Sequence, residues 1–358
     1  MSENQNKQQA AIINASAEAK PKTVWFRLRE NAARAGLDSF LLLLISLIVV
    51  AYWWPELGET GGLLPLETIS TYGVALIFFF YGLRLSAEKL RAGLKNWQLH
   101  VLIQVTTFIL FPLLVLTGKA FISSEQQNVL WLGAFYLAAL PSTVSSSVVM
   151  VSIAGGNLPA AIFNASISSL LGVFITPLWM GWYLHTSTGQ FDFWPIIGKL
   201  TVQVLVPVML GILLNSRFGG FAERNKTKLR LFDQTIILII VFNSFCESFS
   251  RHLFQGLSSL NIFFLGFCLA LFFFLVMGLV YLFCWLLHLN HENKITALFC
   301  GSKKSLVHGT VMSKVLFPDA AVAGLVLLPI MIYHALQLIF ASIIAQAIAR
   351  RSKKQQAI

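Results

Sequence analysis

The sequence predicts an all-α polytopic membrane protein with ten transmembrane helices, built as two inverted five-helix repeats. Three observations lead to this fold class: the composition, the distribution of basic residues and the positions of two interrupted spans. Hydrophobic residues make up 56% of the 358 residues and charged residues only 11%, whereas soluble domains carry roughly 25% charged residues. A soluble fold has too little polar surface for such a chain, so we expect the apolar stretches to lie in a bilayer.

The apolar stretches divide the chain into ten spans. Residues 1–36 are polar, lack the apolar core of a signal peptide and include an expected interfacial helix at 25–34. We expect the first repeat at 37–185, the second at 186–349 and a polar tail at 350–358. The predicted spans are 37–53, 64–85, 97–116, 128–154, 158–184, 194–215, 231–250, 262–289, 293–317 and 320–349.

Lys and Arg residues flank these spans unevenly. If the spans alternate in direction, Lys119, Lys199, Arg251 and Lys314 fall on one side of the membrane and nearly all the others on the opposite side. This asymmetry predicts that both termini are cytoplasmic. The net charge of +11 therefore reflects topology, and it does not form one basic face that would bind nucleic acid.

Two spans are interrupted near their centres. Pro141 and the S-T-V-S-S-S run after it interrupt the fourth span, and Gly301 with S-K-K-S interrupts the ninth. Each is the fourth span of its half, and because each half has five spans, the halves insert with opposite orientation. Paired interrupted spans at corresponding positions indicate an inverted-repeat transporter and mark its binding site.

Hydroxyl groups gather at the first interruption. Hydroxyls and free carbonyls at a broken helix suit a hard cation such as Na⁺, whereas half-helix N-termini suit anions. Close helix packing, with hydroxyls bonded to i−4 carbonyls, is the alternative interpretation. The residues predicted to bind an ion or solute here are Ser142, Thr143, Ser145, Ser146 and Ser147, together with Gln104, Asn164 and Ser168 of the neighbouring spans.

Lys303 and Lys304 are two basic residues that no predicted loop contains. A lysine at the centre of a membrane helix costs about 2.5–3.5 kcal/mol on insertion scales, and a charge at that depth indicates a functional site. Both lie too far from the span ends for their stems to reach an interface. We therefore expect a wet cavity or an anionic partner, and the predicted site residues of this stretch are Gly301, Ser302, Lys303, Lys304, Ser305 and His308.

Two stretches carry a family resemblance: P-S-T-V-S-S-S-V-V-M-V-S-I-A-G-G-N (141–157) and F-C-G-S-K-K-S-L-V-H-G (299–309). They resemble the bile acid:sodium symporter family, and more closely its SBF-like branch of YfeH-type symporters. The likeness covers residues 37–349. It implies broken helices 4 and 9 that cross, and a core of helices 3–5 and 8–10 that moves against a panel of helices 1, 2, 6 and 7. It also implies Na⁺ behind the crossing, with Ser146, Ser147 and Asn164 as candidate ligands and serine in place of the family's usual asparagine at 147.

The ninth helix departs from this family pattern. The Glu-x-x-x-Gln sodium ligands are missing, and Gly301, Ser302, Lys303 and Ser305 occupy that region. We hypothesise that a lysine side chain takes the place of one cation. The transporter would then be proton-coupled, sodium-independent or coupled to a single sodium ion.

The predicted function is secondary active transport of a small organic solute, expected to be anionic, across the bacterial inner membrane. Na⁺ or H⁺ is the expected coupling ion, and no other cofactor or metal is predicted. The alternatives are an uncoupled facilitator and a membrane scaffold or regulator, which would need no polar centre. An enzyme is not predicted, because the sequence contains no H-E-x-x-H, G-x-S-x-G or phosphate-loop motif.

Overall fold

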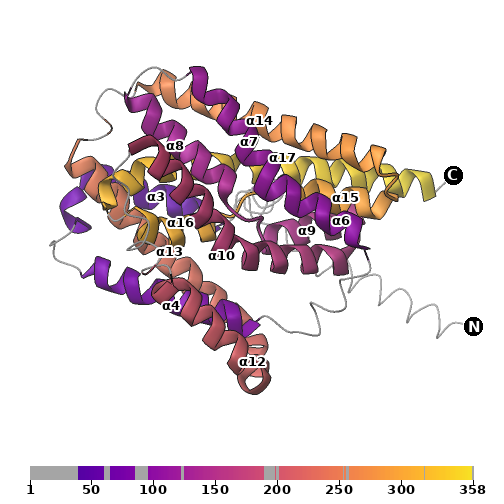
Figure 1. Ribbon diagram of the computed structural model, residues 1–358, viewed down its shortest axis with the longest axis horizontal. Helices are drawn as coiled ribbons and strands as arrows, with labels where there is room; N and C mark the ends of the chain where they lie inside the picture. Colours follow the sequence, from indigo (N-terminus) through magenta and orange to yellow (C-terminus); the bar gives the residue numbers. More distant parts are fainter. Residues whose placement is uncertain are drawn as a thin grey trace, which may run out of the picture.

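The computed structural model describes residues 39–59, 65–84, 96–121, 125–188, 198, 201–252, 254, 258–317 and 319–356. Within these ranges the regular structure is helical, without a strand (Figure 1). Seven of the described helices are long and apolar enough to cross a membrane, and α3 is a shorter apolar helix. The predicted N-terminal tail and interfacial helix lie outside the described residues.

The first part of the chain supplies three long segments and one interrupted one. The π-helical turn η3 (Thr106–Leu110) joins α6 to α7 as a continuous helix. The helices are α3 (Ser39–Trp53), α4 (Leu66–Arg84), α6 (Trp97–Val105), α7 (Phe111–Thr117), α8 (Glu125–Ala139), α9 (Ser145–Ala154) and α10 (Leu158–Thr188).

The second part of the chain has a similar succession of long and short helices. Its π-helical turn η5 (Thr201–Leu205) leads directly into the first long helix. The helices are α12 (Val206–Arg224), α13 (Lys226–Ser250), α14 (Ser259–Leu286), α15 (His291–Gly301), α16 (Leu306–Leu316) and α17 (Ala320–Gln356).

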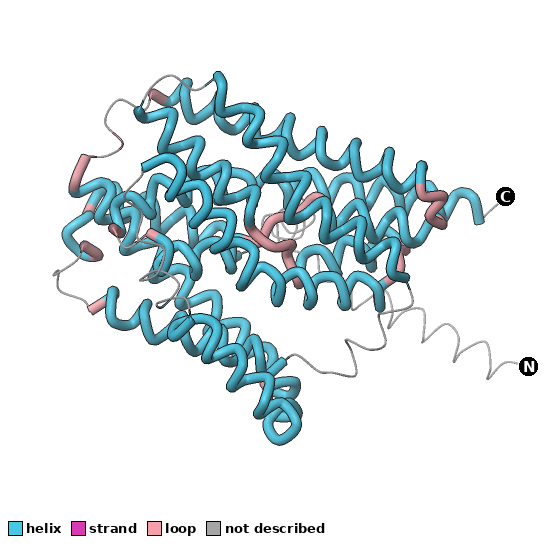
Figure 2. The backbone as a smooth tube through the Cα atoms, viewed as in Figure 1, coloured by secondary structure: helices cyan, strands magenta, loops and turns pink. Residues whose placement is uncertain are grey.

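Both predicted interruptions are present. α8 ends at Ala139, and α9 begins five residues after Leu140, at Ser145. Gly301 is the last residue of α15, so the second interruption begins one residue after the predicted position, at Ser302. Figure 2 shows the loops between these half-helices near the centre of the molecule.

The predicted spans 194–215 and 231–250 leave a loop at 217–230 between them, and this prediction is wrong. α12 continues to Arg224 and α13 begins at Lys226, so Asn225 alone separates them. Hydropathy does not mark where a helix ends, and the Ala, Glu, Arg and Lys residues of this segment are good helix formers that outweigh Gly219 and Gly220. For the same reason α17 extends beyond the predicted end of the tenth span, to Gln356.

α4 and α12 lie together along one side of the molecule (Figure 1). Glycines bring the two backbones together: a Cβ atom on Gly82 would lie 2.1 Å from the Val208 carbonyl oxygen, and one on Gly211 would lie 2.2 Å from that of Phe79. Small residues allow this close approach between membrane helices. α13 then connects the pair to the rest, because it contacts α3, α4, α16 and α17.

Candidate functional site

The ends of the two interrupted helices satisfy each other's backbone groups. Ser142 Oγ donates to the Cys300 carbonyl at 2.6 Å, and Ser147 Oγ donates to the Phe299 carbonyl at 3.0 Å. In return, the backbone N–H of Ser305 donates to the Pro141 carbonyl at 2.9 Å. The last carbonyls of a helix have no intrahelical partner, so the serines of the first interruption cap the C-terminal end of α15.

The Lys304 side chain caps the C-terminal end of α8. Its ammonium nitrogen lies 2.6 Å from the carbonyl oxygen of Ala138, 2.8 Å from that of Leu140 and 2.6 Å from that of Thr107. The same nitrogen lies 4.1 Å from the centroid of the Phe111 ring. With a residue exposure of 1%, the lysine has exchanged water for three carbonyls and one aromatic face.

The Thr107 carbonyl is available because of the π turn and a proline. In η3 the N–H of Phe111 donates to the Thr106 carbonyl, so it cannot donate to Thr107. The next donor in that register would be residue 112, but Pro112 has no N–H. The Thr107 carbonyl therefore accepts from Lys304.

Gln337 of α17 holds the backbone of Lys304. The N–H of Lys304 donates to Gln337 Oε1 and the Gln337 amide donates back to the Lys304 carbonyl, both at 2.8 Å. One turn earlier, the Tyr333 hydroxyl donates to the Ser302 carbonyl at 2.8 Å. α17 thus holds the backbone of the second interruption in place through these hydrogen bonds.

Lys303 has a different environment from its neighbour. Its ammonium donates to Ser146 Oγ at 2.9 Å, and Ser146 donates onward to Thr143 Oγ1, which also bonds Ser147 Oγ. Lys303 is fully buried, and among the described residues Ser146 is its one hydrogen-bond acceptor. Because an ammonium group has three donors, Lys303 can donate to a further group.

Asn164 and Gln104 form a second polar group with His100. Gln104 Nε2 lies 3.3 Å from Asn164 Oδ1, and Asn164 Nδ2 lies 2.8 Å from His100 Nδ1. Of the three predicted Na⁺ ligands, Ser146 and Ser147 therefore share one hydrogen-bonded chain through Thr143, while Asn164 belongs to another group. Ser168 lies one turn after Asn164 in α10. Its hydroxyl accepts from the backbone N–H of Ser142 at 2.9 Å, which connects α10 to the first interruption.

The remaining predicted site residues have local roles in the structure. Ser302 Oγ donates to the Leu298 carbonyl, and Ser305 caps α16 by accepting from the N–H of His308. His308 also bonds Ser305 through Nδ1, and its ring lies 5.6 Å from that of Tyr81 in α4. At Gly301, a Cβ would meet its nearest neighbour at 3.5 Å, an ordinary contact, so the site does not require glycine there. The side chain of Ser145 lies outside the described atoms.

The sequence interpretation missed Gln337 and the groups around the Lys304 ammonium. Gln337 is a buried amide in a long apolar span, and that contrast is a signal that polarity alone could have revealed. Thr107, Ala138 and Leu140 contribute only backbone oxygens, which no side-chain pattern identifies.

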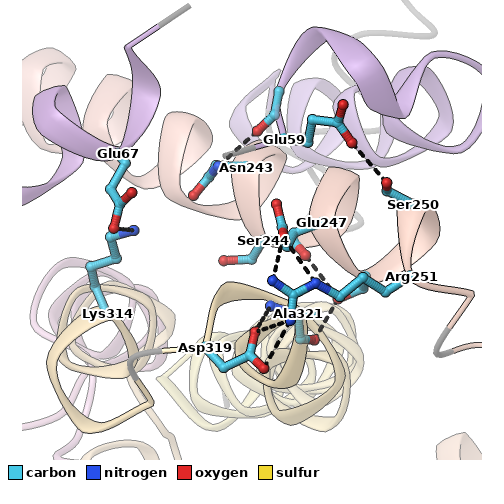
Figure 3. A network of polar contacts seen from close by, with 12 residues as sticks. Glu59, Glu67, Asn243, Ser244, Glu247, Ser250, Arg251, Lys314, Asp319 and Ala321 are labelled. Carbon is cyan, nitrogen blue, oxygen red and sulfur yellow. Dashed lines mark hydrogen bonds and ion pairs between the residues drawn. The ribbon is translucent and has the colours of Figure 1, made fainter. Parts of the chain in front are cut away.

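A cluster of ion pairs lies at the end of the molecule where α17 begins, opposite the C-terminus (Figure 1). Arg251 after α13 bonds Glu247 at 2.6 Å and Asp319 at 3.0 Å, and Lys314 of α16 lies 3.7 Å from Glu67 of α4 (Figure 3). The cluster therefore connects α4 and α13 to α16 and the start of α17.

Apolar helices long enough to span a bilayer, with polar groups gathered where two interrupted helices meet, define a membrane protein with transporter architecture. The chain belongs to the SBF-like CPA transporter family, whose model matches residues 38–350. This confirms the resemblance to the SBF-like branch drawn from the sequence.

Individual relatives agree with this family. The chain is 40% identical to an uncharacterized protein of Pseudomonas aeruginosa, over 88% of this chain and 93% of the relative. It is 36% identical to "Putative symporter YfeH" of Escherichia coli, over 90% and 96%. It is 30% identical to "Sodium/bile acid cotransporter 7" of Rattus norvegicus, over 88% and 93%.

Proposed function

We propose that this chain is a secondary active transporter that moves a small organic anion by alternating access, coupled to Na⁺ or H⁺. The family and the names of two relatives, a symporter and a sodium/bile acid cotransporter, support the transport class. The observation that carries the proposal is the fully buried Lys303 ammonium, whose described hydrogen-bond partner is a single hydroxyl.

The preference for an anion rests on two sources of positive charge at the same place. Lys303 donates to Ser146, which lies in the first turn of α9. A helix N-terminus carries roughly half a positive charge, and an ammonium has donors beyond the one that Ser146 uses. A carboxylate or similar group beside Lys303 would accept from both.

The ten-span, inverted-repeat topology is part of this proposal. The seven long apolar helices, α3, and the half-helix pairs α8/α9 and α15/α16 account for ten spans if each pair crosses once. Each half-helix pair is followed by a long helix, α10 or α17. With the positive-inside asymmetry, this topology gives cytoplasmic termini in a bacterial inner membrane.

Alternating access requires two groups of helices that move relative to each other. We propose α3, α4, α12 and α13 as one group, and the helices around the interruptions as the other. The ion pairs Lys314–Glu67 and Arg251–Asp319 lie across this boundary at one end of the molecule. Such pairs would hold that end closed and would separate when it opens.

Uptake by purified protein in proteoliposomes tests the proposal. A panel of radiolabelled organic anions, cations and neutral metabolites is offered with and without inward Na⁺ and pH gradients. We expect at least one anion to be accumulated only when a gradient is present. Uptake that reaches equilibrium without any gradient dependence would instead identify a facilitator.

A further inference from the structure

We propose that the Lys304 ammonium is a tethered cation that permanently fills a cation position at the helix crossing, so that transport proceeds without a free ion bound there. The inference rests on the proposed function for its role in coupling. The position itself rests only on the geometry around Lys304.

The groups around the ammonium are those that bind a small hard cation. In transporters with broken helices, unwound carbonyls and half-helix C-terminal ends coordinate Na⁺. Here the carbonyls of Ala138 and Leu140 come from the C-terminal end of α8, and the Thr107 carbonyl comes from the π turn, all within 2.8 Å of Nζ. The negative end of the α8 dipole and the face of Phe111 add to the attraction for positive charge.

The neighbouring carbonyls at this end of α8 accept from other groups. The carbonyl of Ala139 accepts from Thr176 Oγ1 and that of Pro141 accepts from the N–H of Ser305. The Ala138 carbonyl would ordinarily accept from Ser142 N–H, but that donor bonds Ser168. The Ala139 and Pro141 carbonyls thus have neutral donors, whereas those of Ala138 and Leu140 converge with that of Thr107 on the Lys304 ammonium.

The number of donors matches the number of acceptors. An ammonium has three N–H groups, and Lys304 has three carbonyl partners. A neutral hydroxyl offers one donor and a primary amide two, so neither would satisfy the set. Lys303, the preceding residue, donates to one hydroxyl, that of Ser146, among the described residues, and it serves as the matched control.

The test is chemical rescue of Lys304→Ala by small cations. Thermal unfolding of the purified protein is measured in methylammonium, sodium and choline chlorides at equal ionic strength. We expect Lys304→Ala to melt below the wild type in choline and to gain several degrees in methylammonium, with the gain rising as the logarithm of concentration. Sodium is expected to produce a gain of the same kind. For the wild type, the melting temperature in methylammonium should equal that in choline, and the same should hold for Lys303→Ala.

A folded Lys304→Ala that melts at the same temperature in all three salts would overturn the proposal. An equal methylammonium gain in Lys303→Ala would also overturn it. If no folded Lys304→Ala can be purified in choline, folded protein should be obtained when the membranes are prepared in methylammonium or sodium. If no folded protein is obtained in either of these cations, the proposal is contradicted. Melting does not depend on transport. Rescue without any solute uptake would therefore retain the tethered cation and reject the proposed function.

Discussion

Lys304 Nζ lies 2.6 Å from the carbonyl oxygen of Thr107, a residue 197 positions earlier in the chain. This bond connects the interruption between α15 and α16 to the π turn between α6 and α7. The other two carbonyls come from the end of α8, so one side chain joins three separate segments. We therefore expect the region around Lys304 to behave as a rigid centre.

Gln337→Ala tests how firmly this centre is held. The substitution leaves the buried N–H and C=O of Lys304 without partners, and each unsatisfied group costs about 1–3 kcal/mol. We expect a clearly lower melting temperature in detergent. Gln346→Ala on the same helix removes a bond to the Ser342 hydroxyl and should lower the melting temperature less; equal losses would contradict the role given to Gln337.

Lys303→Gln tests the site proposed for the solute. It removes the charge beside Ser146, and a hydrogen bond to a charged group is worth about 1.5–3 kcal/mol. We expect solute affinity to fall about 10- to 100-fold, measured by equilibrium binding of the transported anion. Lys303→Arg keeps the charge and should lose less. Unchanged affinity in Lys303→Gln would exclude Lys303 from the site.

Cross-linking tests the proposed movement between the two helix groups. Cysteines in place of Glu67 and Lys314, whose charged atoms lie 3.7 Å apart, would be joined by a short bifunctional thiol reagent. We expect the cross-link to abolish uptake and reduction of a cleavable linker to restore it.

The matched control for this experiment lies within one group. Arg84 of α4 and Asp233 of α13 also form an ion pair, at 2.9 Å, and both helices belong to the same proposed moving group. A cross-link between cysteines at 84 and 233 should leave uptake intact. Full uptake with the 67–314 cross-link in place would refute the proposed boundary.

Two glycine substitutions test helix packing. Gly82→Ala places a Cβ against the Val208 backbone, so α4 and α12 must separate, and we expect a destabilisation of about 1–3 kcal/mol, as for other overpacked sites. In Gly301→Ala the added Cβ makes only ordinary contacts, and residue 301 is helical. The substitution should therefore be tolerated. Equal melting temperatures for the two variants would contradict this packing.

The sequence was sufficient for the features that hydropathy and helix breaking control. It predicted the helical membrane class, both interruptions and the burial of Lys303 and Lys304. It could not distinguish the two lysines, because their difference depends on which backbone oxygens converge on each ammonium. It also placed a loop at 217–230, because charge density shows where water begins but not where a helix ends.

Solute accumulation in proteoliposomes tests the central claim most directly. With the transported anion identified, an inward Na⁺ or pH gradient is imposed on vesicles containing wild-type protein and then collapsed with an ionophore. We expect the anion to accumulate above its external concentration and to return to equilibrium when the gradient is collapsed. At a concentration below the wild-type Kd, Lys303→Gln vesicles should accumulate it more slowly. An internal concentration that never exceeds the external one under either gradient would contradict secondary active transport.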